Sequence, residues 1–496
     1  MKQLTKFFLT LHRLLGIVLC LFFLMWFLSG IVMLYHRFPR VYESDRVEHL
    51  EPLGGSDSLP ALPTLLAQAE GKKVSGMRME RYLGQTYFNI QTSDSTYVVN
   101  AHEGEALHSM AEPDFMQRVR DSWYQAPVAR IDTLTKLDQW VPFGSMKAHL
   151  PIYRYTYDDE EEHQLYQSST TGRVLNYTTH AERFWAWLGA IPHWIYFYQL
   201  RQYIDLWNDV VVYSSGIGCI MVIAGLFLGI QRWVQYRKRG NKGVTPYKKR
   251  LYKWHHIGGL IFGVFALTFV FSGMMSMMSL PSWITHSHLG SSPARYMTAN
   301  APQPSDYVLD YRKVVEAYPQ ALQITWSNFR HHPFFTVTTP DDVYYVDGNL
   351  AEVTGLDISR DEFLGTVQAF FQTDSTTMNR DIQLEANLID QFETYYRERS
   401  VIDRDKLLPV WKIEANDRDH SVFYMNPRTG NVRYVDRSSR LNYWAYTALH
   451  RLRIGYLNSN TPLRKTIIWI MMLGGAVVSF TGLVMGVRRI RRWICK

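Results

Sequence analysis

Apolar residues are concentrated in four blocks of this 496-residue chain, and the sequence between the blocks is largely polar. The blocks run from Leu9 to Tyr35, from Val210 to Val234, from His256 to Leu280 and from Ile467 to Val487. Each has about the 20 residues that an α-helix needs to cross the hydrocarbon core of a bilayer. We therefore predict an integral membrane protein with four transmembrane helices in contact with membrane lipid.

Two long regions of soluble-looking sequence separate these helices, and each is long enough for one or two compact domains. Alternating runs at Tyr87 to Gln91 and Thr96 to Asn100, and again at Phe334 to Thr338 and Val343 to Asp347, favour hairpins of half-buried strands. A helical stretch from Leu59 to Ala69 precedes the first hairpin, which indicates α+β domains. The predicted segments are residues 1–36 (first transmembrane helix), 37–206 (first outer region), 207–234 (second helix), 235–253 (basic linker), 254–280 (third helix), 281–463 (second outer region), 464–488 (fourth helix) and 489–496 (basic tail).

The basic residues lie beside the apolar blocks, in the N-terminal segment, the linker between the second and third blocks, and the tail. These three segments hold 17 lysines and arginines and no acidic residue, so the rest of a chain with formal charge +8 is net acidic. Because basic segments beside membrane spans stay on the cytoplasmic side, we expect both termini and the linker in the cytoplasm. The positive charge therefore indicates topology, and no nucleic-acid partner is predicted.

The chain contains an internal repeat. Seven residues before and within the second span recur 257 positions later with one change, Ala224 to Thr481, and four residues of the first span recur 243 positions later. The repeated residues are Arg183, Trp187, His193, Ala224, Gly225, Leu226 and Gly229 with Arg440, Trp444, His450, Thr481, Gly482, Leu483 and Gly486, and His12, Gly16, Ser29 and Gly30 with His255, Gly259, Ser272 and Gly273. Two tandem halves of about 240 residues follow, each with the order helix, outer domain, helix.

Several motifs resemble those of PepSY-associated transmembrane proteins. They are HRLLG…LSG and HHIGG…FSG in the first and third spans, WLGAIPH and YTALH before the second and fourth spans, and the turns YVVNAHEGEAL and FYMNPRTGNV. The resemblance covers nearly the whole chain. It implies four transmembrane α-helices in two tandem halves related by a pseudo-two-fold axis, each with an α+β PepSY-like periplasmic domain. Family members include bacterial inner-membrane ferrisiderophore reductases with b-type haem, which implies a role in iron acquisition.

His12 and His255 begin the first and third spans at equivalent repeat positions. A histidine at membrane depth usually has a partner or a cofactor, and a neutral imidazole is a common axial ligand of haem iron. Gly16 and Gly259, one helical turn further on, lie on the same face and would leave room for a porphyrin. We predict that His12 and His255 bind one haem between them, with His256 as the reserve ligand. The alternative is that both histidines only sit at the headgroup boundary.

His193 and His450 form a second pair, each about 16 residues before its half's outgoing span and within an aromatic stretch typical of the membrane interface. We predict that they hold a second haem near the outer surface, the alternative being interfacial histidines bonded to backbone carbonyls. His36 is a rival ligand, because it emerges at the outer edge of the first span, about 36 Å along the helix from His12. Its repeat counterpart is Ser279, so a role for His36 would be asymmetric.

Two b-type haem groups near opposite faces would carry electrons outward to reduce a periplasmic ferric siderophore or another ferric chelate. The sequence lacks C-x-x-C-H, which argues against covalent haem, and lacks a G-x-G-x-x-G nucleotide fingerprint, so the donor is expected to be a quinol or a cytoplasmic reductase. The chain is then a haem-dependent ferric-chelate reductase without catalytic acid–base residues. The alternative is a non-enzymatic sensor or regulator whose outer domains bind a periplasmic protein or peptide. A chelate transporter is disfavoured because no span contains a buried acid or a proline break.

Overall fold

The computed structural model of the protein describes residues 2–55, 59–67, 69, 71–93, 96–101, 113–277, 288–299, 302–378, 380–396 and 407–495. Among these residues, four helices are long and apolar enough to cross a membrane. They are α1 (Lys2–Val32), α8 (Ile204–Lys238), α9 (Arg250–Met277) and α18 (Thr461–Ile494). The four predicted spans are confirmed as helices, although the predicted end of the third, at Leu280, lies outside the described residues. All four helices extend into the basic segments beside the apolar blocks, because lysine and arginine are good helix formers.

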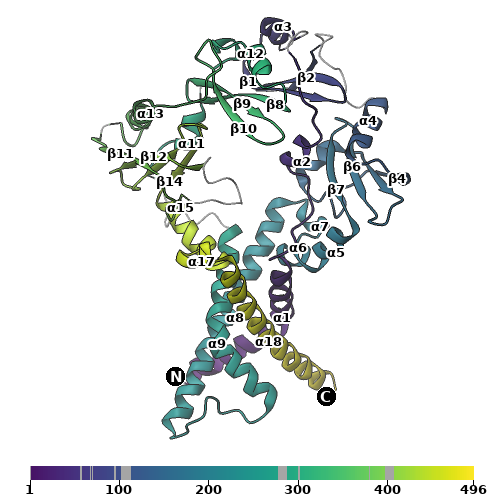
Figure 1. Ribbon diagram of the computed structural model, residues 1–496. Coiled ribbons are helices and arrows are strands. Elements are labelled where there is room, and N and C mark those ends of the chain that lie inside the picture. The colour runs from purple at the N-terminus through teal and green to yellow at the C-terminus, as the bar shows by residue number, and fades with distance from the viewer. Residues whose placement is uncertain are drawn as a thin grey trace.

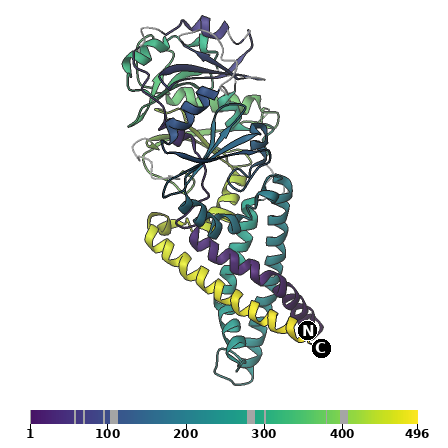
Figure 2. The ribbon, with the colours of Figure 1, turned by 90° about the vertical axis from the view of Figure 1, so that its right-hand side faces the viewer.

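The four long helices form a bundle in which each helix packs against two others. Helix α1 contacts α8 and α18, and α9 contacts the same two helices, so α1 and α9 occupy opposite corners. Both chain termini and the α8–α9 linker lie at one end of the bundle, and all the strands lie at the other (Figures 1 and 2). Phenylalanine rings pack onto glycines in the bundle, Phe23 onto Gly218 and Phe27 onto Gly475, where a Cβ atom would come within 2.9 Å and 2.6 Å of the ring. The interior between the helices is therefore closely packed.

The sheet farthest from the bundle is built from both halves of the chain. Its order is β10-β9-β8-β1-β2-β3, and every neighbouring pair is antiparallel. The central pair, β1 and β8, places Met79 opposite Ile324, and both side chains are fully buried. Residues 37–206 and 281–463 thus share one sheet and one core. The strands are β1 (Val74–Tyr82), β2 (Gln85–Thr92), β3 (Thr96–Asn100), β8 (Gln323–Phe329), β9 (His332–Thr338) and β10 (Val343–Asp347), which confirms the predicted hairpins.

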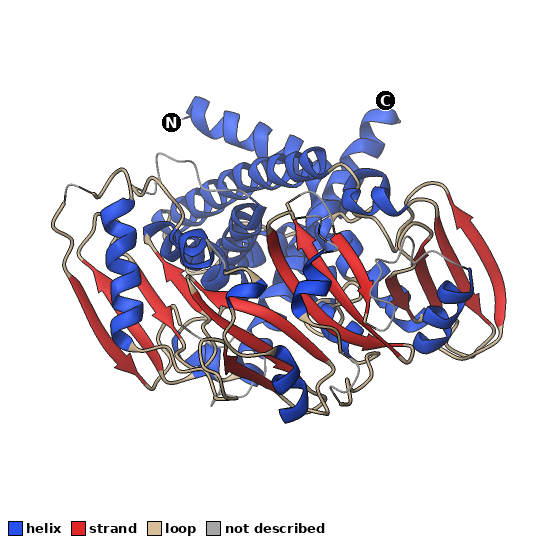
Figure 3. Ribbon diagram, turned by 90° about the horizontal axis from the view of Figure 1, so that it is seen from above, coloured by secondary structure: helices blue, strands red, loops and turns tan. Residues whose placement is uncertain are grey.

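Two further antiparallel sheets lie between the six-stranded sheet and the bundle, one on each side (Figures 1 and 3). The first has the order β4-β5-β6-β7 and the second β11-β12-β13-β14. Their strands are β4 (Val128–Leu134), β5 (Ile152–Tyr157), β6 (Gln164–Ser168), β7 (Val174–Thr178), β11 (Leu384–Ile389), β12 (Val410–Ala415), β13 (Val422–Met425) and β14 (Val432–Val435). Each sheet is followed directly by the short helices that lead back to the bundle.

The remaining described helices are short and cover or connect the sheets, so both outer regions combine helices with strands as predicted. They are α2 (Glu43–Val47), α3 (Leu62–Ala67), α4 (Pro113–Trp123), η1 (Gly144–His149), α5 (His180–Leu188), α6 (Ala190–Trp194), α7 (Tyr198–Arg201), α11 (Pro293–Thr298), η2 (Pro304–Asp306), α12 (Tyr311–Ala317), α13 (Arg360–Thr373), α15 (Arg437–Asn442), the π-helix η3 (Tyr443–Ala448), α16 (Leu449–Arg451) and α17 (Gly455–Ser459).

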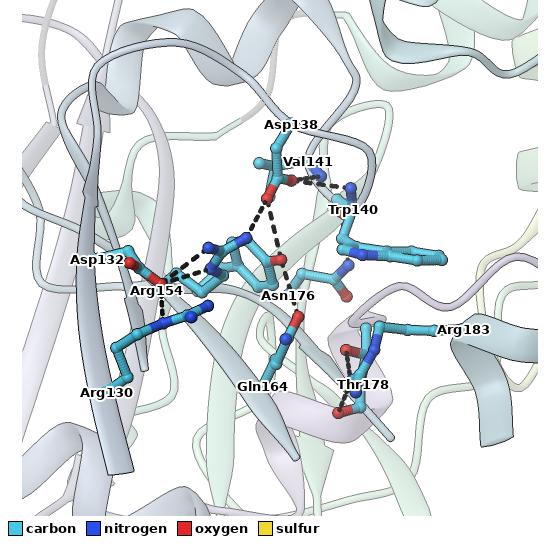
Figure 4. A network of polar contacts seen from close by, with 11 residues as sticks. Arg130, Asp132, Asp138, Trp140, Val141, Arg154, Gln164, Asn176, Thr178 and Arg183 are labelled. Carbon is cyan, nitrogen blue, oxygen red and sulfur yellow. Dashed lines mark hydrogen bonds and ion pairs between the residues drawn. The ribbon is translucent and has the colours of Figure 1, made fainter. Parts of the chain in front are cut away.

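A polar network fixes the loop that follows β4 (Figure 4). The Arg154 guanidinium on β5 lies 2.8 Å from the Asp132 carboxylate and 3.3 Å from that of Asp138. The other oxygen of Asp138 accepts the backbone N–H of Trp140 at 2.9 Å, and the Asn176 amide on β7 donates to the Trp140 carbonyl at 2.6 Å. Strands β4, β5 and β7 are therefore tied to one loop, and the Trp140 side chain on that loop belongs to the core beneath α5 and α6.

His332 joins the six-stranded sheet to α13. Its Nδ1 lies 3.0 Å from the Glu362 carboxylate on α13, and its Nε2 lies 3.2 Å from the Asp347 carboxylate at the end of β10. Burial alone would lower the pKa of His332, but the two carboxylates outweigh it and raise the pKa above its ordinary value of 6.5. The protonated ring is thus favoured in the folded protein.

Replacing Met79 by alanine should destabilise the outer part of the protein, because it removes a fully buried side chain from the pair of strands that joins the halves. We expect the free energy of unfolding to fall by about 2 to 5 kcal/mol. Met378 is 55% exposed, so Met378→Ala is a matched control that should change little. Denaturant unfolding of the purified protein, followed by near-ultraviolet circular dichroism, measures both values. Equal effects of the two substitutions would contradict this account of the core.

His332 should make stability pH-dependent. Because its folded-state pKa is raised, its contribution is fully present below the unfolded-state pKa and is lost as pH rises through the folded-state pKa. Between about pH 6 and about pH 9 the midpoint of thermal unfolding should fall more for the native protein than for His332→Gln. The neighbouring His331 is exposed, so His331→Gln should retain the native pH dependence. An identical pH profile for His332→Gln and the native protein would exclude this role.

Candidate functional site: two histidine pairs in the helix bundle

His12 and His255 face each other near the linker end of the bundle. They belong to α1 and α9, the two helices at opposite corners. Their ring centroids are 6.3 Å apart, and the ring planes are inclined by 48°. The structure therefore brings together the pair predicted from the first and third spans.

A backbone carbonyl of a neighbouring helix anchors each of these rings. His12 Nδ1 lies 3.0 Å from the Met221 carbonyl oxygen on α8, and His255 Nδ1 lies 3.2 Å from the Val478 carbonyl oxygen on α18. The Thr481 hydroxyl lies 3.0 Å from the same nitrogen of His255. Because a carbonyl only accepts hydrogen bonds, Nδ1 carries the proton and donates it. Nε2 then has a free lone pair, which is the state in which a neutral imidazole binds a metal.

His193 and His450 form the second pair, at the sheet end of the bundle. Their ring centroids are 6.2 Å apart with the planes inclined by 55°. His193 Nδ1 lies 3.2 Å from both the Trp26 carbonyl oxygen and the Ser29 hydroxyl of α1. His450 Nδ1 makes the equivalent contacts on α9, at 3.2 Å to the Phe269 carbonyl oxygen and 3.1 Å to the Ser272 hydroxyl. Both rings thus also present Nε2 as the unprotonated nitrogen.

Short helices that bridge a sheet and the bundle carry the second pair. On α6, Ala190 and Ile191 are fully buried in the core beneath the β4–β7 sheet, while His193 contacts α1. The residue that follows α6 is Ile195, whose φ is 53°, and the residue that follows α16 is Leu452, whose φ is 48°. A left-handed conformation is unfavourable for side chains of this bulk. This left-handed conformation occurs two residues after each histidine, so the chain turns sharply just beyond each ring.

Arg183 and Arg440, an equivalent pair in the repeat, tie the chain before each of these histidines to its sheet. Arg183 donates to the Thr178 carbonyl at 3.2 Å and to the Glu162 carbonyl at 2.7 Å. Arg440 donates to the Asp419 carbonyl at 3.1 Å. The sequence repeat contains both arginines, and the structure shows their common task of fixing α5 and α15.

Glycines let the backbone approach each imidazole closely. A Cβ atom on Gly225 would lie 2.6 Å from His12 Cε1, and one on Gly482 would lie 3.3 Å from His255 Cε1. Gly30 and Gly273 have the same relation to the second pair, at 3.3 Å and 3.5 Å from His193 and His450. These four glycines and the two serines recur in the sequence, but no role was assigned to them there because their partners lie on other helices.

The spacing within each pair fits a metal ion between the two rings. An ion about 2 Å from each Nε2 would separate the ring centroids by about 6 Å, which agrees with both observed separations. A largely apolar pocket of about 720 Å³ adjoins the second pair and is lined by residues that include Phe23, Trp26 and Trp207 as well as both histidines. Two opposed neutral imidazoles in apolar surroundings are the axial ligand set of a b-type haem, so the residues fit that group.

The two other candidate ligands lie elsewhere. His36 stacks on the Trp185 ring, with centroids 4.3 Å apart and planes inclined by 3°. His256 is buried, and its Nε2 lies 3.1 Å from the Gly229 carbonyl oxygen. Neither ring has a ring contact with the four paired histidines among the described residues. Gly259 has no atom within 4 Å of its Cβ position, and Gly16 has only Cys20 Sγ, at 3.9 Å, so both glycines leave space on their faces of α1 and α9.

The four long apolar helices and the two facing, half-buried histidine pairs define a helical membrane protein with paired imidazoles at two levels of its bundle. The sequence matches the family model of the PepSY-associated TM region over residues 11–334, which is more than half of the chain. The chain therefore belongs to the PepSY-associated transmembrane family. No curated protein matches the sequence.

Gly225→Ala tests the close approach of α8 to His12. The new methyl group would overlap the ring, while a helix gains about 1 kcal/mol from replacing glycine by alanine, so a loss at the site would not reflect a weaker helix. If haem occupies the site between His12 and His255, its retention during size-exclusion chromatography should fall, measured as haem per polypeptide by absorbance. Gly216→Ala on the same helix meets only Met274 Sδ at 3.6 Å and should retain the native ratio. Native retention by Gly225→Ala would show that His12 has another position available.

Proposed function

We propose that this protein transfers electrons across the bacterial inner membrane through two b-type haem groups and reduces a ferric siderophore or another ferric chelate in the periplasm. The observation that carries the proposal is the arrangement of four imidazoles in two facing pairs, each ring with Nδ1 bonded to a carbonyl and Nε2 free. His12 with His255 would hold one haem group, and His193 with His450 would hold the other. Bound haem supplies reversible one-electron redox chemistry at its iron.

The residues around the rings hold them ready for this role. The carbonyl acceptors fix the tautomer and the orientation of each ring, which preserves the ligand geometry in both oxidation states. Ser29 and Ser272 add a second contact to His193 and His450, and each also donates to a carbonyl on its own helix, at 3.2 Å and 3.0 Å. The rings are therefore held by α1 and α9 as well as by the short helices that bear them.

The two pairs span most of the membrane thickness. His12 and the Trp26 carbonyl that anchors His193 are 14 residues apart on α1, and His255 and the Phe269 carbonyl that anchors His450 are 14 residues apart on α9. At 1.5 Å per residue this is about 21 Å, within a hydrocarbon core of about 30 Å. Leu19 and Phe23 are buried between the two levels, so this interval of the bundle is apolar.

Two tandem halves related by a pseudo-two-fold axis would account for this arrangement. The contacts of α1 and α9 with α8 and α18, the strand order of the six-stranded sheet and both histidine pairs are unchanged when equivalent elements of the two halves are exchanged. The basic linker and tail support a cytoplasmic position for the linker end of the bundle, with the sheets in the periplasm.

Electrons would enter at the His12–His255 level and leave at the His193–His450 level. The donor would be a quinol in the bilayer or a cytoplasmic reductase. The acceptor would be the ferric chelate, which takes up one electron and becomes the ferrous form. Chelators with hard oxygen ligands hold ferrous iron more weakly, so this reduction would release the metal for uptake.

Removing one ligand from each pair tests the proposal. The native protein should bind two haem groups per chain and show the reducible absorbance of a six-coordinate b-type haem. His255→Ala and His450→Ala should each lose about one haem per chain, because a single remaining imidazole binds the iron less firmly. His36→Ala is the control and should retain both. Haem is measured by absorbance, and ferrous release from a ferric chelate is measured with a ferrous-specific dye.

Added imidazole should partly restore haem binding to each alanine variant, which distinguishes a lost ligand from a misfolded bundle. A purified native protein without haem absorbance, or unchanged haem content in both variants, would overturn the proposal. Unchanged content would favour a non-enzymatic sensor whose outer domains bind a periplasmic protein or peptide.

A further inference from the structure

A second pocket lies far from the histidine pairs in the fold, where the β4–β7 unit meets the six-stranded sheet. It comprises about 620 Å³ of space, part of which is open to solvent. Its walls come from four separate parts of the chain, namely α2 with the residues after it, strand β1, helix α4, and the β6–β7 turn with the start of β7, and Gln323 of β8 closes it from the second half. Junctions between structural units are frequent sites of small-molecule binding.

Three arginines converge on this pocket, which we call the arginine pocket: Arg46 from α2, Arg78 from β1 and Arg173 from the β6–β7 turn. The Glu43 carboxylate contacts all three, at 3.1 Å from Arg46, 2.9 Å from Arg78 and 3.8 Å from Arg173. The Glu80 carboxylate lies 3.1 Å from Arg78 Nε. The three guanidinium groups and two carboxylates leave one uncompensated positive charge.

The positive potential in the pocket affects its own side chains. Partial burial lowers the pKa of Arg173, whose side chain is half exposed, and the nearby positive charge of Arg46 lowers it further. Partial burial would raise the pKa of Glu43, but the three arginines outweigh it and lower the pKa. Arg46 Nε is buried and has no hydrogen-bond partner among the described residues. The pocket thus favours negative charge.

An aromatic wall lines the same pocket as these arginines. The Trp123 ring stacks on His49, with centroids 4.1 Å apart, and His49 Nδ1 donates to the Ser122 carbonyl at 3.1 Å. Tyr82 and Phe115 complete the wall, and the Tyr82 hydroxyl is engaged by Ser122 Oγ at 2.7 Å. His49 Nδ1 and the Tyr82 hydroxyl are thus already hydrogen-bonded within the protein. The aromatic wall therefore offers mainly ring faces and edges to a ligand.

We propose that the arginine pocket binds a small organic anion in which a carboxylate is attached to an aromatic ring. The carboxylate would pair with Arg46 and Arg78, since a guanidinium group matches a carboxylate in charge and planar geometry. The ring would lie against Trp123 and Phe115. The Glu43 side chain is 52% exposed and occupies the position of the ligand carboxylate, so it competes with the ligand and moves aside on binding. This site is independent of the proposed electron transfer.

Isothermal titration calorimetry of the full-length purified protein tests the site with benzoate, its uncharged analogue benzamide, and acetate, which lacks the ring. Benzoate should bind at least about tenfold more tightly than either analogue, because one lacks the charge and the other lacks the aromatic contact. Absent benzoate binding, or benzamide binding of equal strength, would overturn the proposal.

Variants with opposite expected effects separate a binding site from an ion-pair cluster that only stabilises the fold. Arg78→Gln should weaken benzoate binding about tenfold or more, since it removes a charged donor. Glu43→Gln should strengthen binding severalfold, because it removes the internal competitor. Arg130 is 62% exposed on β4 and is absent from the pocket wall, so Arg130→Gln should bind benzoate as the native protein does.

Arg78→Gln could fail to fold, so a second variant of the same pocket is needed. Arg173→Gln serves this purpose, because Arg173 lies on a turn, its side chain is 51% exposed, and its replacement should leave the fold intact. It should also weaken benzoate binding. Weaker binding by Glu43→Gln, or unchanged binding by a folded Arg78→Gln and by Arg173→Gln, would show that these residues form a structural cluster and no ligand site.

Discussion

A histidine inside a membrane is stable as a metal ligand only if one ring nitrogen is satisfied by the protein and the other is kept free. In this protein a backbone carbonyl on a different helix meets that condition for each of the four paired rings. Carbonyls inside helices normally accept the bond of their own helix, so each of these oxygens uses its second lone pair. The arrangement requires the donor and acceptor helices to be placed to within a hydrogen-bond length, which makes the bundle packing the constraint on which both sites depend.

Glycine residues allow the helices to pack at the short distance that these hydrogen bonds require. Where α8 and α18 pass His12 and His255, Gly225 and Gly482 remove the side chain that would hold the helix away from the ring. His193 and His450 lie on short helices that cannot fix the position of their rings alone. The outer sheets hold these helices in place. Ala190 and Ile191 anchor α6 in a sheet core, and Arg183 anchors the helix before it. The outer domains therefore position the second pair as well as presenting a surface to the aqueous phase.

The two kinds of site differ in their electrostatics, and each suits its surroundings. The paired histidines lie among apolar side chains and make neutral hydrogen bonds, which is favourable at membrane depth. The arginine pocket lies between sheets, where water screens its ion pairs and where a half-exposed Glu43 can exchange with solvent. The proposed anion site and the proposed haem sites thus lie in separate parts of the chain. The shared six-stranded sheet connects these parts mechanically, because β1 contributes Arg78 to the pocket and Met79 to the core that joins the halves.

The sequence alone determined the elements that depend on local pattern. Four apolar blocks determined the long helices, alternating residues determined hairpins such as β2–β3 and β9–β10, and the repeat related His12 to His255 and His193 to His450. Only the tertiary structure decided that β1 pairs with β8, that the Nδ1 atoms face carbonyls on neighbouring helices, and that three arginines from distant segments meet at one pocket. The physical reason is that hydropathy and periodicity report how a segment meets its surroundings, whereas a contact between segments depends on how whole helices and sheets pack in three dimensions.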